Sequence, residues 1–263
     1  TVKGRNGSWQ LITCVFYYKE RGTDMIALYG YYGYGYYYDP MYILIIISCI
    51  IAFIAQIKVK STFNKYSKVA SSRGMTGAMV AEQLLRSQGI YDVSIQRVSG
   101  SLSDNYNPRN KTLNLSDSVY NSTSVAAIGV AAHETGHAIQ HATGYGPLSF
   151  RTALFPVANI GSRLSWVFII LGLIFGSTNI LVDIGILMFS LAVLFQLVTL
   201  PVEFNASARA LQLLESQGYL YADENRQARK VLSAAAMTYV AAAATAILQL
   251  LRLIYLFGGR RRD

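Results

Sequence analysis

Charged residues are scarce in this sequence. Asp, Glu, Lys and Arg make up 14% of its 263 residues and 52% are hydrophobic, whereas soluble domains carry about 25% charged residues. This balance excludes an ordinary water-soluble domain and favours a protein embedded in a membrane. The net charge is +9, but the basic residues are not interleaved with aromatic residues as on a nucleic-acid-binding surface. We therefore expect a lipid bilayer as a partner and no nucleic acid.

Cysteine and histidine are scarcer still. The two cysteines, Cys14 and Cys49, lie in the N-terminal tail and in an apolar run, which excludes a disulfide framework and a cysteine-ligated zinc site. The three histidines, His133, His137 and His141, all fall within nine residues. We therefore expect the catalytic or metal-binding residues to lie in this cluster.

The sequence contains three long apolar runs. Residues 41–57 carry no charge and approach the roughly 20 residues that span a bilayer, so they predict a transmembrane helix. Residues 164–200 form a second run, interrupted at residues 176–179, which predicts a membrane hairpin with a short first limb. A third run, residues 231–257, is rich in alanine and is also predicted to cross the membrane. For the first hairpin limb and the third run, a buried soluble helix is the alternative.

Basic residues beside these runs predict the orientation of the chain. The first run is followed by Lys58, Lys60, Lys65 and Lys68. Residues 58–163 also carry more Lys and Arg than Asp and Glu, and basic segments stay in the cytoplasm, so this part is predicted to face the cytoplasm. The basic tail, residues 258–263, conflicts with four spans, because it would then lie outside. Either one limb does not span, or the orientation rule is violated.

The first 40 residues form a tail of mixed polarity that ends in a segment rich in tyrosine and glycine. Beside an apolar run, such aromatic residues are typical of the membrane interface; a low-complexity adhesive segment is the alternative. Residues 1–24 have neither the pattern of a signal peptide nor a packable period. Met25 is therefore a candidate internal start.

His133, Glu134 and His137 form the pattern H-E-x-x-H. The pattern lies in an uncharged apolar run that begins after candidate N-cap hydroxyls at residues 122–124 and can end near Ala142, before Gly144. Residues four apart share one face of a helix, so both imidazoles can bind one metal ion. Glu134 can then take a proton from a water at the open position of the metal. The alternative is a structural histidine pair with a surface glutamate.

Two histidines do not complete a catalytic zinc site, which uses three protein ligands. His141 is eight residues from His133, about 12 Å along a helix axis, so we expect it to support the ligands or to line the substrate cleft. Glu203 is the better candidate, because it begins a polar helical segment, residues 201–230, where the hairpin returns to the side of the histidines. The alternative is a glutamate favoured by the dipole at a helix N-terminus.

The segment between the first apolar run and the histidines predicts a small β element. Residues 76–88 have helical spacing and end before Gly89, whereas residues 92–98 and 111–116 alternate like strands. Residues 104–110 predict a turn-rich loop. A strand directly before a zinc-binding helix can offer its edge to an extended peptide substrate; a half-buried structural strand is the alternative.

Three motifs follow one another among the apolar runs. They are D-x-Y-x-P-R-x-K-x-L-x-L-S at residues 104–116, A-A-H-E-x-G-H-A-I-Q-H-A at 131–142 and E-F-N-A-S-x-R-A at 203–210. In this combination the chain, from about residue 30 to its end, resembles the YugP-type neutral zinc metallopeptidases of bacterial membranes. The resemblance implies a mainly α-helical integral membrane protein. It also implies a zincin-like helical core, a small β element and three to four transmembrane helices.

This family is similar to the HtpX-type membrane gluzincins, whose third zinc ligand is the glutamate of an E-x-x-A-D motif. By this resemblance, Zn²⁺ is the expected cofactor, and Glu203 is expected to join His133 and His137 as its ligand. Ser207 stands where the related group has an acid that orients a ligand histidine. Asn205 or Ser207 is therefore expected to supply a neutral hydrogen bond instead.

The function expected from these residues is that of a membrane-bound zinc metalloendopeptidase with Glu134 as general base. Its substrates would be peptides or membrane proteins, at a site that faces the cytoplasm from the bacterial cell membrane. Arg209, His141 and Tyr239 are candidates for stabilising the oxyanion. One alternative is a membrane protein with a structural or sensory zinc site and no proteolytic activity. The other is a membrane interaction protein that binds no metal.

Overall fold

The computed structural model describes residues 42–175 and 179–258. The predicted interfacial tail, Met25 and the basic residues after Gly258 lie outside the described residues. The described residues form seven helices and a three-stranded sheet. In chain order they are α3 Tyr42–Tyr66, α4 Gly77–Ser87, β1 Ser94–Val98, β2 Asn105–Asn107, β3 Thr112–Ser116, α5 Asp117–Tyr120, α6 Val125–Ala142, α7 Gly146–Phe175, α8 Asn179–Ser216 and α9 Ala222–Gly258.

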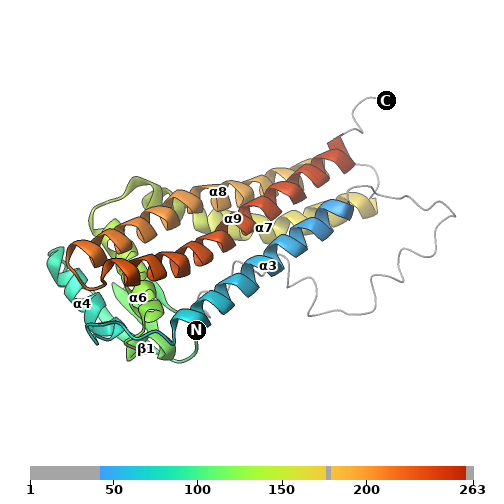
Figure 1. Ribbon diagram of the computed structural model, residues 1–263. Coiled ribbons are helices and arrows are strands. Elements are labelled where there is room, and N and C mark those ends of the chain that lie inside the picture. The colour runs from blue at the N-terminus through green and yellow to red at the C-terminus, as the bar shows by residue number, and fades with distance from the viewer. Residues whose placement is uncertain (1–41, 176–178, 259–263) are drawn as a thin grey trace.

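Four of the described helices, α3, α7, α8 and α9, are long and apolar enough to cross a membrane. They lie side by side as a bundle (Figure 1). Their outer faces expose large apolar side chains, such as Ile46 and Phe53 on α3 and Ile174 on α7. Apolar faces of this extent suit contact with lipid rather than water. The chain is therefore a mainly α-helical membrane protein, as the sequence predicts.

The helices extend beyond the apolar runs that predict them. α3 continues past residue 57 to Tyr66, and α7 begins at Gly146, so the first limb of the hairpin is a full-length helix rather than a short one. α8 runs through Pro201 without a break. The polar segment 201–230 therefore begins no new helix. It comprises the last part of α8, a turn and the first turns of α9.

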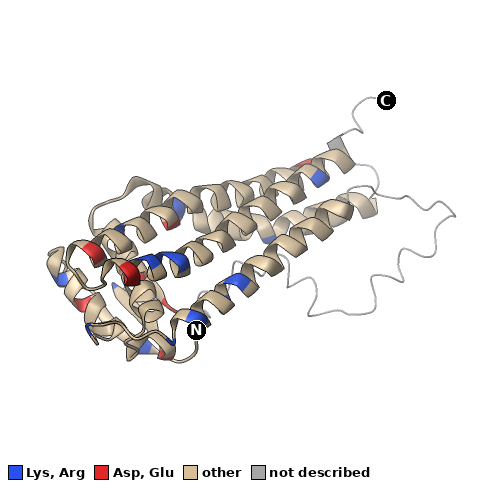
Figure 2. Ribbon diagram, viewed as in Figure 1, with Lys and Arg blue, Asp and Glu red and all other residues tan. Residues whose placement is uncertain are grey.

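All four long helices reach the end of the bundle where α4, α6 and the sheet pack (Figure 1). The first turn of α3 and the last turn of α9 both lie at the opposite end (Figure 1). Charged residues gather at the end that carries α6, whereas few lie along the rest of the bundle (Figure 2). The end with α6 is thus the part of the described chain that is suited to water.

The sheet has the strand order β1-β3-β2, with β1 parallel and β2 antiparallel to β3. β2 lies in the segment that the sequence predicts as a loop. Its backbone pairs with that of β3, and polar side chains add to this pairing. The Asn105 side chain accepts from that of Asn114 at 2.8 Å, and Asp104 accepts from the backbone N–H of Ser116 at 2.7 Å. The sequence left two interpretations of the strand before the motif helix, and the structure agrees with the structural one, because β3 is central and β2 is an edge strand.

α6 carries the H-E-x-x-H pattern and is held by its neighbours on several sides. The Ser124 hydroxyl caps its first turn by accepting from the backbone N–H of Ala127 at 3.2 Å, and Gly144, with φ +62°, follows its last turn. Both ends agree with the sequence prediction. Buried apolar side chains of α6 form one cluster with those of α4, α8 and α9. The cluster includes Leu84, Ile128, Leu214 and Leu232.

Candidate metal centre

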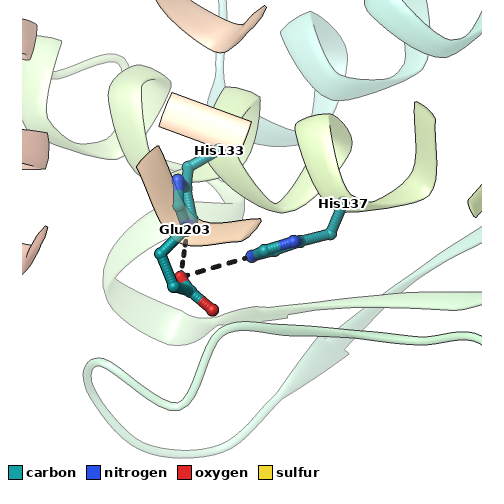
Figure 3. A group of neighbouring side chains, drawn as sticks. All are labelled: His133, His137 and Glu203. Carbon is teal, nitrogen blue, oxygen red and sulfur yellow. Dashed lines mark ion pairs between the residues drawn. The ribbon is translucent and has the colours of Figure 1, made fainter. Parts of the chain in front are cut away.

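His133 and His137 lie one turn apart on α6, and both rings point towards Glu203 on α8 (Figure 3). Oε2 of Glu203 is 3.3 Å from Nε2 of His133 and 3.5 Å from Nε2 of His137. One ligand atom from each of the three residues lies within 4.8 Å of the other two. Zinc bonds of about 2.0–2.2 Å in a tetrahedral arrangement place ligand atoms about 3.3 Å apart. The separation of the carboxylate from both imidazoles matches this value.

The Glu203 carboxylate itself points to a cation. Only 2% of its side chain is exposed, and its Oε2 receives no hydrogen bond from the described part of the chain. Arg151 contacts only the other oxygen, Oε1, at 3.3 Å. Oε2 therefore remains costly to bury unless a cation also binds on its side. Two imidazoles and one carboxylate also form a donor set found in catalytic zinc sites. The residues therefore fit a zinc ion.

Gln140, which is fully buried, orients the ring of His137. Its Nε2 donates to the backbone carbonyl of Val202 at 2.8 Å and to Oδ1 of Asn205 at 3.0 Å. Because a carbonyl can only accept, Gln140 must turn its Oε1 towards Nδ1 of His137, 3.0 Å away. Nδ1 therefore donates to Gln140, which leaves Nε2 as the nitrogen that faces Glu203 and can bind a metal.

Ser207 and Arg209 lie on the same helix as Glu203. The Ser207 hydroxyl is 3.0 Å from Nδ1 of His133, so a neutral group contacts this ring, in line with the expectation from the sequence. Arg209 donates from Nε to Oδ1 of Asn205 at 2.8 Å, and its guanidinium lies over the ring of Tyr145. Arg209 thus anchors the side chain that in turn holds Gln140.

Glu134 lies between the two histidines in the sequence, and a strand holds its carboxylate. Oε2 of Glu134 accepts a hydrogen bond of 3.0 Å from the backbone N–H of Tyr106 in the edge strand β2. Burial raises the pKa of Glu134 to about 7. His141 lies outside the group of three ligand atoms, and its Nδ1 is 2.8 Å from the Tyr106 hydroxyl.

The approach of α6 to α8 depends on Gly136. A Cβ atom at this position would lie 2.6 Å from the carbonyl oxygen of Ala206, closer than a side chain can come. Gly136 directly precedes His137, and Ala206 lies one turn after Glu203. The two small residues thus let the backbones touch beside the ligands. A glycine inside a helix costs up to about 1 kcal/mol of helix stability relative to alanine. Its presence in the motif helix therefore indicates, from the sequence, that another backbone packs closely there.

Sequence reasoning did not find three residues of this centre. Gln140 could have been found, because it lies three residues from His137 on one helix face. Tyr106 and Arg151 lie on other elements, and no spacing along the chain shows that they come close. Nη1 of Arg151, in α7, is 3.3 Å from Oε1 of Glu203. Tyr239 of α9, an oxyanion candidate from the sequence, also interacts with the Glu203 side chain.

Comparisons with known proteins identify the family of the chain. Residues 41–258 match the model of a family described as "Putative neutral zinc metallopeptidase". The chain is 49% identical over 207 residues to the "Putative membrane protease YugP" of Bacillus subtilis (strain 168), a match that covers 79% of this chain and 92% of that protein. No solved structure matches the chain. The family match covers most of the chain, which therefore belongs to this family of neutral zinc metallopeptidases.

Proposed function

We propose that the chain is a membrane-bound zinc metalloendopeptidase in which His133, His137 and Glu203 hold Zn²⁺ and Glu134 is the general base. One observation carries the proposal. Both imidazole Nε2 atoms converge on Oε2 of Glu203, a buried oxygen that lacks a hydrogen-bond donor among the described residues. The family match supports zinc as the metal and peptides as the substrates.

Zinc bound by these residues would lower the pKa of a water molecule and polarise the carbonyl of a peptide bond. Glu134 takes the proton of the attacking water and delivers it to the leaving amine. The N–H of Tyr106 fixes Oε2 of this carboxylate, which leaves Oε1 to exchange the proton.

The remaining candidates have supporting roles in this proposal. Ser207 orients His133, and Arg209 acts through Asn205 and Gln140 on the other ligand histidine. His141, which is hydrogen-bonded to Tyr106 beside the general base, is our candidate for stabilising the oxyanion. Ser207 and Arg209 are thus assigned to holding the ligand histidines, whereas His141 is assigned to contact with the substrate.

We place the centre on the cytoplasmic side of the membrane. The supporting feature is the row of lysines at the end of α3 that lies beside α6, since basic segments stay in the cytoplasm. Glu203 lies on α8 shortly after the apolar part of that helix. A centre at this depth suits substrates in or beside the bilayer, such as membrane proteins and their juxtamembrane segments.

Cysteine labelling tests the orientation. Tyr91 is 78% exposed at the end of the bundle that carries α6, so Tyr91→Cys offers a reactive thiol there. A membrane-impermeant maleimide should label this variant in inside-out vesicles and not in intact cells, with the unsubstituted chain as the control for its own cysteines. Labelling in intact cells and not in inside-out vesicles would reverse the orientation.

Zinc content tests the ligands. The detergent-purified protein should hold about one zinc per chain, as expected for one three-ligand site. Glu203→Ala should lose the metal, because two histidines alone hold it weakly. His141→Ala should keep it. Absence of zinc from the unsubstituted, metal-replete protein would contradict the proposed function, and loss only in His141→Ala would mean that the third ligand is the wrong residue.

Hydrolysis tests the role of Glu134. Glu134→Gln should keep zinc and lose peptide hydrolysis by a factor of about 10² or more, since a positioned general base contributes about 10²–10⁴-fold. A labelled casein can serve as the substrate. Glu82→Gln, which changes an exposed glutamate of α4, is the matched control and should cleave normally. Equal hydrolysis by Glu134→Gln and the unsubstituted protein would favour a different base. Zinc binding without hydrolysis of peptides or membrane proteins by the unsubstituted chain would favour a structural zinc site.

A further inference from the structure

The two oxygens of Glu203 have different partners. Oε2 faces both histidines, whereas Oε1 lies 3.3 Å from Nη1 of Arg151. Only one of the two oxygens is joined to the histidines in Figure 3. The carboxylate is 2% exposed and the Arg151 side chain is 28% exposed, so the ion pair joins a partly exposed guanidinium to a buried carboxylate. One oxygen of the carboxylate thus contacts the Arg151 guanidinium, and the other faces the expected position of the metal.

The turn between α6 and α7 brings Arg151 to this position. α6 ends at Ala142, and Gly144 adopts the left-handed conformation that terminates a helix. The backbone N–H of Tyr145 then donates to the carbonyl of Gln140 at 2.9 Å, which closes the turn. α7 begins at Gly146. Arg151 therefore lies in the second turn of α7, close to the end of the helix that carries the histidines.

Arg151 differs in charge from the other groups that hold the ligands. The neutral side chains of Ser207 and Gln140 contact the two ligand rings, whereas the third ligand meets a guanidinium. Carboxylates bind metal ions through one oxygen or through both. An arginine that donates to one oxygen competes with the metal for it, because charge-assisted hydrogen bonds to carboxylates are strong.

We propose that Arg151 is a positioning residue for Glu203: its guanidinium holds Oε1 and leaves Oε2 as the single oxygen that faces the metal. A second carboxylate oxygen would add a fifth ligand beside the water that hydrolysis needs and would take up space that the substrate needs. Arg151 thereby keeps the coordination number at four. The inference rests on the proposed function, since it requires Glu203 to be a ligand.

Visible spectra of the Co²⁺-substituted protein test the proposal without measuring activity. Four-coordinate Co²⁺ absorbs visible light more strongly than five-coordinate Co²⁺, so the spectrum reports the number of ligands. Arg151→Met removes the donor at similar length and should lose visible absorptivity as both oxygens bind. Arg151→Lys keeps a cationic donor and should retain the spectrum of the unsubstituted protein. Arg86→Met, at an exposed arginine of α4, is the control and should also retain it.

A second variant that removes the guanidinium of Arg151 controls for misfolding. Because the Arg151 side chain is partly exposed, guanidinium ions added to Arg151→Ala can reach the vacated space and should restore the strong absorption. An unchanged spectrum in a folded Met or Ala variant would overturn the proposal. If the unsubstituted protein binds no Co²⁺, the proposed function fails instead. An unchanged spectrum with bound metal refutes the role of Arg151 alone.

Discussion

Replacing Gly136 with alanine tests whether the contact between α6 and α8 creates the metal site. The new Cβ would lie 2.6 Å from the carbonyl oxygen of Ala206 and 3.2 Å from its Cα and carbonyl carbon. All three are backbone atoms, which cannot rotate away as the end of a side chain can. Ordinary contact begins at 3.4 Å. The helices must therefore separate locally by the difference between 3.4 and 2.6 Å, about 0.8 Å.

This separation acts on the ligand atoms. Glu203 is on α8 and both histidines are on α6, at 3.3 and 3.5 Å, whereas metal–ligand distances tolerate roughly ±0.2 Å. Overpacking costs about 1–3 kcal/mol. Zinc binding must close the helices against this cost, so the Kd for zinc should rise about 5- to 140-fold at roughly 1.4 kcal/mol per factor of ten.

The metal-free variant should remain folded. Alanine is favoured over glycine inside a helix by up to about 1 kcal/mol, and without metal the helices can relax apart. The Kd can be measured in detergent by competition with a chromophoric chelator, and far-ultraviolet circular dichroism reports the fold. Loss of zinc affinity with retained helicity would separate a defect of the site from a defect of folding.

Gly129→Ala is the matched control, because it makes the same change on the same helix. Its Cβ would meet the Cβ of Ala228 on α9 at 3.3 Å, close to ordinary contact, so a small adjustment accommodates it. This variant should bind zinc as the unsubstituted protein does. Unchanged zinc affinity in a folded Gly136→Ala, or an equal loss in both variants, would refute the reasoning.

Other contacts of the centre lead to three shorter predictions. Gln140→Ala removes the acceptor that keeps a proton on Nδ1 of His137, so zinc affinity in the same competition assay should fall about 10- to 100-fold. Ser207→Ala removes the only side-chain partner that the described residues give Nδ1 of His133; its zinc affinity should also fall, and an unchanged Kd would mean that the hydroxyl does not support the ligand. Burial raises the pKa of Asp104 above 3.8, so folding favours its protonated form, and stability falls as the pH rises from that value through the raised pKa. Thermal denaturation of Asp104→Asn should lack this contribution, and equal pH dependence of both proteins would contradict it.

The histidine pair could be predicted because helical geometry alone relates residues four apart. Glu203 is predicted from its place after the hairpin, and the family resemblance strengthens that prediction, but the local argument for it was wrong in one respect. It was expected to begin a new helix, yet it lies well inside α8, which continues through Pro201. A glutamate in that position is not at a helix N-terminus, so the alternative explanation by the helix dipole does not apply.

The contacts between elements could not be predicted, since they depend on how distant segments pack. Residues 105–107 resemble a loop because they lie in residues 104–110, which contain three asparagines and one proline. They become a strand through bonds to β3. The start of α7 was missed because Arg151, Pro156 and Arg163 lower the hydropathy of the part before residue 164. The hydropathy of this segment does not predict a helix, so the sequence did not indicate that Arg151 contacts the proposed third ligand.

The pair α7 and α8 links the membrane part of the protein to the candidate metal centre. A Cβ atom at Gly185 would lie 2.8 Å from the carbonyl oxygen of Ser165, so the two helices approach as closely as glycine permits. Within lipid, where apolar burial no longer drives association, such close packing holds helices together. The same helices carry Arg151 and Glu203 at the end beside α6. The distance between arginine and carboxylate is therefore a property of this helix pair, and the geometry of the centre involves the membrane helices as well as α6.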